Sequence, residues 1–344
     1  MRVFLTLAAL AFATATAPSL PAWAADAPYK APRNGFGQPD LEGVWTNASL
    51  TSLERGPQFK TLTITEAQAQ QAEAMRARMM AAQNRPSDPD AGAPVAGNDP
   101  GGYNSFWVDP GTRMGRIKGE VRTSWLVEPA DGKLPYRPEG WKLYQDTLTK
   151  VRNTFDGPEA RPLGERCILG FGSTAGPPMM NVLYNNHYQV QQSADAVVIV
   201  VEMNHDARVI RLADSRRLPD GEPEWMGKSV GRWEGDTLVV ETTGFNPGES
   251  LRPYFGASLF LSPDAKVTER FTRIANDQIL YQFEVDDPKV YKSVWKAEMP
   301  LNATKGPVYE YACHEGNYSL PGILAGARKA ESEGRKPEAV GISE

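Results

Sequence analysis

Acid–base side chains gather where one predicted strand ends and the next begins. Glu202 follows Val198 and Val200 in strand alternation, which predicts that its carboxylate points the same way as two buried valines. His205 lies in the turn that follows, and Arg208 begins the next predicted strand. Burial at a barrel mouth raises the pKa of a carboxyl group toward values that suit proton transfer. We expect Glu202 to take a proton, His205 to deliver one and Arg208 to stabilise an oxyanion. The alternative is a Glu202–Arg208 salt bridge with a solvated His205.

A second group of such side chains follows a cysteine. The chain has two cysteines, Cys167 and Cys313, and in an exported protein such a pair predicts a disulfide, the alternative being two buried thiols. His314 and Glu315 come directly after Cys313, so the disulfide would fix their backbone. Both are candidate catalytic residues, with His314 as a second candidate base. A disulfide-anchored loop with a capping histidine accounts for them equally well.

The same residue types are candidate metal ligands. Two histidines and a carboxylate can hold zinc or non-haem iron, and the chain offers His205, His314, Glu202 and Glu315 for such a set. However, neither an HxH nor an HExxH spacing places two of these ligands on one element. We therefore expect no metal and no other cofactor.

Aromatic residues supply candidates for contact with a ligand. Tyr103 and Trp107 follow a Pro/Gly-rich stretch, while Trp233 and Tyr254 lie in or beside the region of predicted strands. Aromatic walls with a few polar anchors suit a sugar, an aromatic compound or a terpenoid. The alternative is that these side chains fill the core of a barrel. We take the four residues as candidate ligand contacts.

The second half of the chain predicts strands in succession. Alternation and short polar turns predict strands over residues 187–192, 196–203, 207–212, 231–233, 237–243, 266–274, 278–285, 293–299 and 307–313. A further strand is expected over 122–128, and helices over 65–83, 138–152 and 320–330, the first with a capping box of Thr65 and Gln68. Hairpin after hairpin predicts an antiparallel meander. We expect a mostly-β fold that closes into a barrel or a strongly curved, lipocalin-like sheet with a few flanking helices, and a two-sheet sandwich as the alternative.

The chain divides by composition into four parts. Residues 1–24 predict a cleaved signal peptide, because Arg2 precedes an apolar run and Ala22, Trp23 and Ala24 form a cleavage site. Residues 25–102 predict an extended and helical segment with a Pro/Gly-rich linker, 103–333 the barrel-like domain, and 334–344 a disordered tail. The signal peptide predicts a periplasmic or secreted protein.

Charge and hydropathy limit the partners. The net charge of −5 over 344 residues argues against nucleic acid, which requires clustered basic residues. No run after the signal peptide reaches the roughly 18 apolar residues of a membrane span. We expect a small-molecule partner, no nucleic acid and no membrane span, and the oligomeric state stays open.

Several longer motifs carry a resemblance. The segments GRWEGDTLVVET (231–242) and YEYACHEGNY (309–318) resemble an uncharacterised family of exported bacterial proteins. Gly43 and Trp45 resemble the GxW element that opens the first strand of lipocalin-type barrels. The resemblance implies a bacterial periplasmic or secreted protein, and it carries over no reaction.

Polar clusters at strand ends have an energetic cost unless they are paired or used. The sequence therefore favours an exported, cofactor-independent acid–base enzyme (a lyase, hydratase, isomerase or hydrolase) acting on a small organic molecule, with aromatic and sugar-like compounds as candidates. The alternative is a periplasmic, lipocalin-like protein that binds a small molecule without transforming it.

Overall fold

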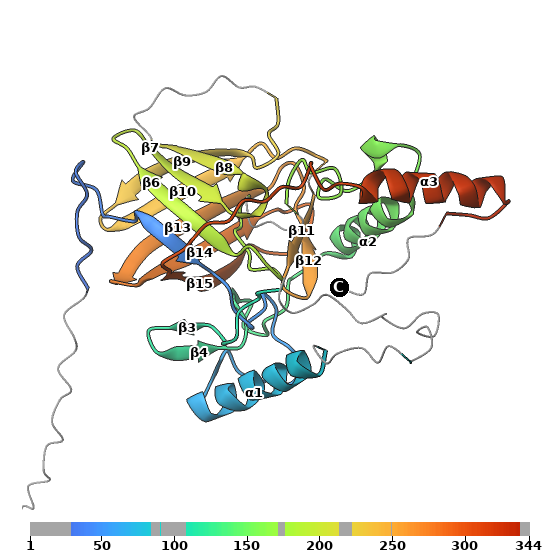
Figure 1. Cartoon of the computed structure of the whole chain (residues 1–344). Helices are drawn as coiled ribbons and strands as arrows, with labels where there is room; N and C mark the ends of the chain where they lie inside the picture. Colours follow the sequence, from blue (N-terminus) through green and yellow to red (C-terminus); the bar gives the residue numbers. More distant parts are fainter. Residues whose placement is uncertain are drawn as a thin grey trace, which may run out of the picture. The chain divides into compact units, whose positions relative to one another are not determined.

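The central feature of the fold is a closed β-barrel (Figure 1). The computed structural model describes residues 29–83, 90, 108–170, 176–212, 222–248 and 250–337. Within these residues nine strands close the barrel, because β15 pairs with β14 and also with β1. Around it the order is β1 (Gly43–Thr46), β6 (His187–Gln192), β7 (Ala196–Val201), β8 (Ala207–Leu212), β9 (Lys228–Glu234), β10 (Thr237–Thr243), β13 (Lys266–Ala275), β14 (Gln278–Asp286) and β15 (Trp295–Ala303). The predicted mostly-β barrel with flanking helices is confirmed.

The interior of the barrel is a packed core. In β14 the residues Ile279, Tyr281, Phe283 and Val285 are buried and alternate with half-buried ones, as the sequence predicts. A cavity among these side chains has a volume of about 10 Å³ and is lined by apolar side chains and Tyr188. That is room for about one water molecule. Side chains therefore fill this barrel, as they fill other barrels of similar strand number.

One neighbouring pair of strands departs from the predicted antiparallel meander. β8 and β9 run parallel, with Arg211 opposite Val230 and Leu212 opposite Gly231. A parallel pair needs a connection that returns the chain to the same end of the sheet, and residues 213–227 form that connection. The prediction of hairpins throughout is wrong here, because strand periodicity carries no information on strand direction.

Two of the predicted strands also differ from the structure. The stretch 122–128 splits into β4 (Glu120–Arg122) and β5 (Leu126–Glu128). The strand is interrupted because the backbone amides of Trp125 and Leu126 donate to the carbonyls of residues 52 and 53, each at 3.0 Å. Residues 307–313 form no strand. Gly306, with a φ of 70°, turns the chain before them, and Cys313 is tied to Cys167.

The first strand of the barrel comes from an early part of the chain. β1 lies within residues 25–102, which the composition places before the barrel-like domain. Trp45 of the GxW element is buried, and its indole Nε1 donates to the Leu41 carbonyl at 3.0 Å. The guanidinium of Arg273 lies 5.5 Å from the centre of its ring. β1 thus belongs to the barrel through its strand pairs and through its core side chain.

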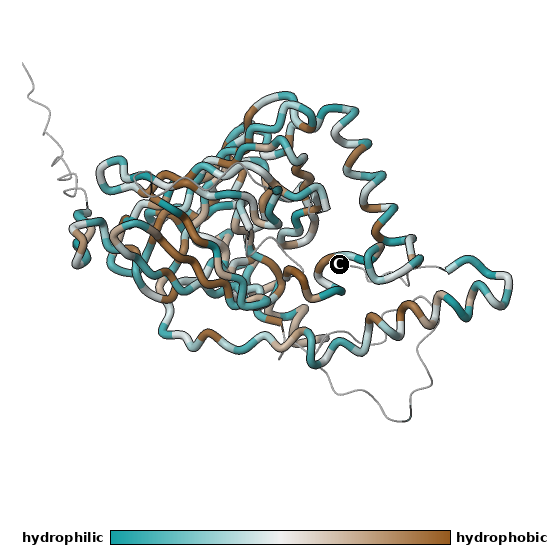
Figure 2. Tube along the Cα trace, turned by 90° about the horizontal axis from the view of Figure 1, so that it is seen from above, coloured by the Kyte–Doolittle hydropathy of each residue, from teal (hydrophilic) through white to brown (hydrophobic). Residues whose placement is uncertain are grey.

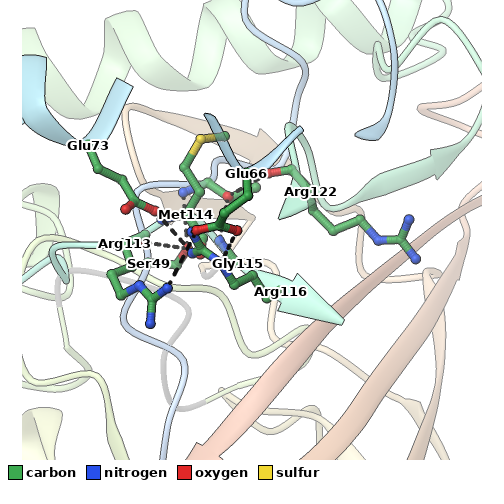
Figure 3. Close-up of polar contacts among 9 residues, drawn as sticks. Ser49, Glu66, Glu73, Arg113, Met114, Gly115, Arg116 and Arg122 are labelled. Carbon is green, nitrogen blue, oxygen red and sulfur yellow. Dashed lines mark hydrogen bonds and ion pairs between the residues drawn. The ribbon is translucent and has the colours of Figure 1, made fainter. Parts of the chain in front are cut away.

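Helix α1 (Glu66–Gln83) begins at the predicted capping box. The Thr65 amide donates to Gln68 Oε1 at 3.0 Å, and the Gln68 amide donates to Thr65 Oγ1 at 3.3 Å. The helix packs on a small sheet of β2 (Thr63–Ile64), β4 and β3 (Arg116–Ile117). Figure 3 shows the carboxylates of Glu66 and Glu73 converging on Arg116, at 2.6 and 3.0 Å. These ion pairs hold the helix to the sheet.

The other helices flank the barrel. α2 (Pro138–Asn153) starts with Pro at its first turn, as predicted, and contacts the hairpin of β11 (Leu251–Tyr254) and β12 (Ala257–Phe260). α3 (Ser319–Ser332) follows the disulfide. In Figure 2 hydrophobic stretches concentrate in the barrel, while the helices alternate hydrophilic and hydrophobic positions. Among the described residues, none of the helices has the length and hydropathy to cross a membrane.

Candidate functional site

Glu202 lies at one end of the barrel beside a histidine. His187 begins β6, and Glu202 follows β7, whose register places Tyr188 opposite Val201. His187 Nδ1 lies 2.7 Å from Glu202 Oε2, and the side-chain Nδ2 of Asn185 donates to Glu202 Oε1 at 2.7 Å. The carboxylate is thereby held at both oxygens. We call His187, Glu202 and Asn185 the rim triad.

The burial of Glu202 has a different cause from the one that alternation suggests. Val198 and Val200 are only half-buried, and the inward residues of β7 are Val197, Ile199 and Val201. Glu202 is 3% exposed because the strand has ended: its φ of −61° and ψ of −45° start a turn that folds it onto His187. The predicted burial is confirmed, but the predicted strand face is wrong.

The rim triad favours a charged imidazole. Interaction with Glu202 raises the pKa of His187, burial opposes this rise, and the more distant Asp109 adds to it. Nδ1 is buried against Glu202, while 21% of the side chain is exposed. Within the described part of the chain Nε2 has no hydrogen-bond partner. The imidazole can therefore exchange a proton with a molecule outside the protein, with Glu202 orienting the ring.

We expect Glu202→Gln to lower the pKa of His187, as measured by NMR titration of the imidazole. Because the folded-state pKa is raised, the pair stabilises the fold fully below about pH 6.5, the unfolded value. This contribution is lost as the pH rises through the folded-state pKa. Unfolding by urea should thus show a larger effect of Glu202→Gln at pH 6 than at pH 9. Glu315→Gln, which changes an exposed carboxylate, is the control, and an unchanged His187 titration in Glu202→Gln would contradict the pairing.

His205 and Asp206 follow Glu202 in the turn. His205 is exposed, with a φ of 44°, and its amide donates to the Glu202 carbonyl at 3.2 Å. Burial raises the pKa of Asp206 to about 6, although the charge of His205 and hydrogen bonds from Asn204 and the Gly170 backbone oppose the rise. His205 thus lies on the same rim as Glu202, but in the described part of the chain its side chain forms no hydrogen bond or ion pair with the rim triad.

Arg208 points into the barrel, away from the rim. It is 2% exposed and forms an ion pair with Glu269, which is fully buried, with Nη1 at 2.9 Å from Oε1. Ser229 Oγ and Thr242 Oγ1 accept from the same guanidinium at 3.1 Å, and the Tyr281 hydroxyl donates to Glu269 at 2.7 Å. These five residues come from β8, β9, β10, β13 and β14, which are neighbours in the sheet. We call them the interior polar layer.

The interior polar layer settles the role of Arg208. The alternative Glu202–Arg208 salt bridge is wrong, because Glu202 pairs with His187 and Arg208 with Glu269. Ser229, Thr242 and Glu269 accept from four of the five N–H groups of this guanidinium. Its 2% exposure leaves an external oxyanion no access to it. Alternation accounts for its place: Arg208, Ile210 and Leu212 are the buried residues of β8.

The predicted disulfide is present. Cys167 and Cys313 are bonded across a separation of 146 residues. His314 and Glu315 are exposed, and no contact among the described residues joins their side chains to the rim triad. The disulfide therefore fixes their backbone without bringing them to Glu202.

The aromatic candidates separate in the structure. Tyr103 and Trp107 lie outside the described residues. Trp233 is half-buried on β9, packs against the core, and its buried indole Nε1 lacks a hydrogen-bond partner. Tyr254 lines a cleft of about 340 Å³ between residues 50–59 and the β11–β12 turn. The cleft is lined by Leu50, Ser52, Glu54, Arg55, Gly56, Gln58, Phe59, Met114, Thr123, Lys133, Tyr254, Phe255, Gly256 and Ala257. We call it the Tyr254 cleft.

Tyr254 is a fixed hydrogen-bond donor in this cleft. Its hydroxyl donates to Glu54 Oε2 at 3.2 Å, and Glu54 Oε1 accepts from the Leu134 amide at 2.9 Å. Burial, followed by the charge of Glu54, raises the pKa of Tyr254 well above its ordinary value. The phenol therefore stays protonated, which suits a binding role better than a role as base.

Several residues of these sites escaped the sequence analysis. His187 is opposite Glu202 in the β6–β7 hairpin. The two predicted strands would have identified it as the partner of Glu202 if residue 188 had been paired with residue 201. Glu54 and Arg55 lie in an irregular stretch after β1, with no periodicity to mark them. In the described residues no cluster of three or more His, Cys, Asp or Glu side chains has the arrangement of a metal site.

Comparisons with known proteins add no assignment. No protein-family model, curated protein or solved structure matches the chain.

Proposed function

We propose that this is an exported protein that binds a small organic molecule in the Tyr254 cleft. The observation that carries the proposal is the cleft itself: its volume of about 340 Å³ lies within the range of small-molecule sites. Its lining combines apolar side chains with a few polar groups, as such sites do. The filled barrel interior makes this outer cleft the better place for a ligand.

Acid–base catalysis is the second candidate function, and the rim triad favours it. In this mechanism the neutral form of His187 takes a proton from the substrate at Nε2 and returns it later in the reaction. Glu202 stabilises the imidazolium that forms between these steps, and Asn185 holds Glu202 in place. The reaction class would be that of a lyase, hydratase, isomerase or hydrolase. Arg208 takes no part, since it is closed inside the barrel.

The proposed location is the periplasm or the extracellular space of a bacterium. Two features support it: the Cys167–Cys313 disulfide, which persists in oxidising compartments, and the signal-peptide pattern of the first 24 residues. The resemblance to a family of exported bacterial proteins is in keeping with both.

Native mass spectrometry of the protein, produced with its leader and purified without denaturation, tests the binding function. We expect the native mass to exceed the mass of the denatured chain by the mass of a small organic adduct. Gln58→Trp, which places an indole at the exposed edge of the cleft, should remove the adduct. Gln191→Trp, an exposed position on β6, should retain it. An adduct that survives Gln58→Trp would contradict binding in the cleft.

The catalytic candidate is tested with that adduct as substrate. Glu202→Gln and His187→Gln should each abolish conversion of the compound while leaving its binding intact. Conversion that persists in both variants would remove the rim triad from the chemistry.

A further inference from the structure

We infer that the Tyr254 cleft selects an anionic ligand, a carboxylate on an apolar or aromatic body, with Arg55 and Lys133 as the groups that bind the charge. This inference rests on the proposed binding function and adds the chemical class of the ligand. The observations that lead to it are the burial of Arg55 and its incomplete set of partners.

Arg55 is buried without a counter-charge. It is 8% exposed and lines the cleft. Its Nη1 donates to the Ala130 carbonyl at 3.0 Å, while its Nε is buried without a partner. Among the described residues it forms no ion pair. A buried charge is costly unless it is paired, so a ligand anion would supply the missing partner.

The backbone and a glycine hold Arg55 in position. The Arg55 amide donates to the Gly132 carbonyl at 3.0 Å. Gly132 has a φ of 72°, and a Cβ there would lie 2.7 Å from Arg55 Cβ. The glycine therefore lets the chain approach the arginine stem closely. The guanidinium is fixed before any ligand arrives, which lowers the entropic cost of binding.

The charges that line the cleft favour an anion. Arg55 and Lys133 are basic, and Glu54 is the one acidic residue among the lining residues of the described chain. Both oxygens of Glu54 already accept hydrogen bonds, from Tyr254 and from the Leu134 amide. Lys133 is exposed, and its ammonium forms no ion pair with a described residue. Two basic groups against one engaged acid leave the cleft with a charge of about +1.

The geometry of the donor groups and the apolar wall of the cleft indicate which kind of anion fits. A guanidinium presents parallel N–H groups that match the two oxygens of a carboxylate. The apolar wall consists of Leu50, Phe59, Met114, Phe255 and Ala257. Inorganic phosphate would use the donors and leave this wall in water. A carboxylate attached to an apolar or aromatic body uses both parts of the cleft.

Isothermal titration calorimetry tests this assignment. The ligands are a panel of aromatic carboxylates, the uncharged carboxamide of each, and inorganic phosphate. We expect the best carboxylate to bind at least about tenfold more tightly than its carboxamide, the factor that one charge-assisted hydrogen bond gives. Arg55→Met should weaken the carboxylate by about tenfold and leave the carboxamide nearly unchanged. Arg113→Met, at an exposed arginine outside the cleft, is the matched control.

Lys133→Gln gives a second measurement of the carboxylate preference, at a residue that is not buried. This exposed position should tolerate the change, and the preference for carboxylate over carboxamide should fall about threefold in it. If Arg55→Met fails to fold, the carboxylate preference of Lys133→Gln decides whether the cleft selects an anion.

The outcomes separate the inference from the proposed function. Carboxamides that bind as tightly as carboxylates would overturn the anionic class and keep the binding function. Phosphate that binds as tightly as the best carboxylate would overturn the role of the apolar wall. A panel in which no compound binds would overturn the inference, while the adduct in native mass spectrometry and its loss in Gln58→Trp decide the proposed function separately.

Discussion

Glu269→Gln should lower the free energy of unfolding by about 3 kcal/mol, the low end of the range for removing one partner of a buried ion pair. The reason lies in the interior polar layer. Arg208 and Glu269 are 2% and 0% exposed, so the arginine charge that remains cannot be solvated. The glutamine amide would also present N–H groups to guanidinium N–H groups. Urea unfolding followed by circular dichroism measures the change.

Two further variants locate the cause of this loss. Glu241→Gln breaks an ion pair with Arg232 in which both side chains are 44% exposed, and it should cost less than about 1 kcal/mol. The double variant Arg208→Met/Glu269→Leu should regain at least half of the stability, because it removes both charges and keeps the volume apolar. A Glu269→Gln protein within about 1 kcal/mol of the parent would mean that the polar layer is open to water.

Removal of the disulfide should have an effect of similar size. The bond closes a loop with a separation of 146 residues, and the chain-entropy relation gives roughly 5 kcal/mol for such a loop. We expect Cys167→Ala/Cys313→Ala to lose about 3 to 5 kcal/mol, measured by thermal and urea unfolding. The destabilisation arises mainly because the unfolded chain gains freedom.

Reduction provides the control for this second prediction. A reductant should lower the stability of the parent protein to that of the double variant and leave the variant itself unchanged. A loss under about 1 kcal/mol, or equal sensitivity of the two proteins to the reductant, would show that the bond does not restrain the unfolded chain.

The elements of this fold were predictable where the signal is local. The capping box of Thr65 and Gln68 marks the start of α1, and alternation from Ile279 to Val285 gives the inward face of β14. The parallel pairing of β8 with β9 was not predictable in this way. Strand direction depends on the connection between Leu212 and Lys228, and periodicity carries no information on it.

The candidate site was predictable in part, for related reasons. Glu202 was correctly expected to be buried, yet through a turn instead of a strand face. The same alternation, applied to Arg208 and Ile210, would have placed the arginine inside the barrel. The partner of Arg208, Glu269, lies three strands along the sheet order and can be found only once the order of the strands is known. The Tyr254 cleft likewise depends on contacts between distant segments.

Ligand binding in the Tyr254 cleft is tested most directly by chemical-shift mapping of the isotope-labelled protein with the tightest-binding aromatic carboxylate. We expect the amide signals of four residues around the Tyr254 cleft to shift as the ligand is added: Gly56, Lys133, Phe255 and Gly256. The signals of Val197 and Leu238, which line the filled barrel interior, should stay in place. Shifts confined to the barrel interior, with the cleft signals unmoved, would contradict binding in the Tyr254 cleft and favour a ligand enclosed by the barrel.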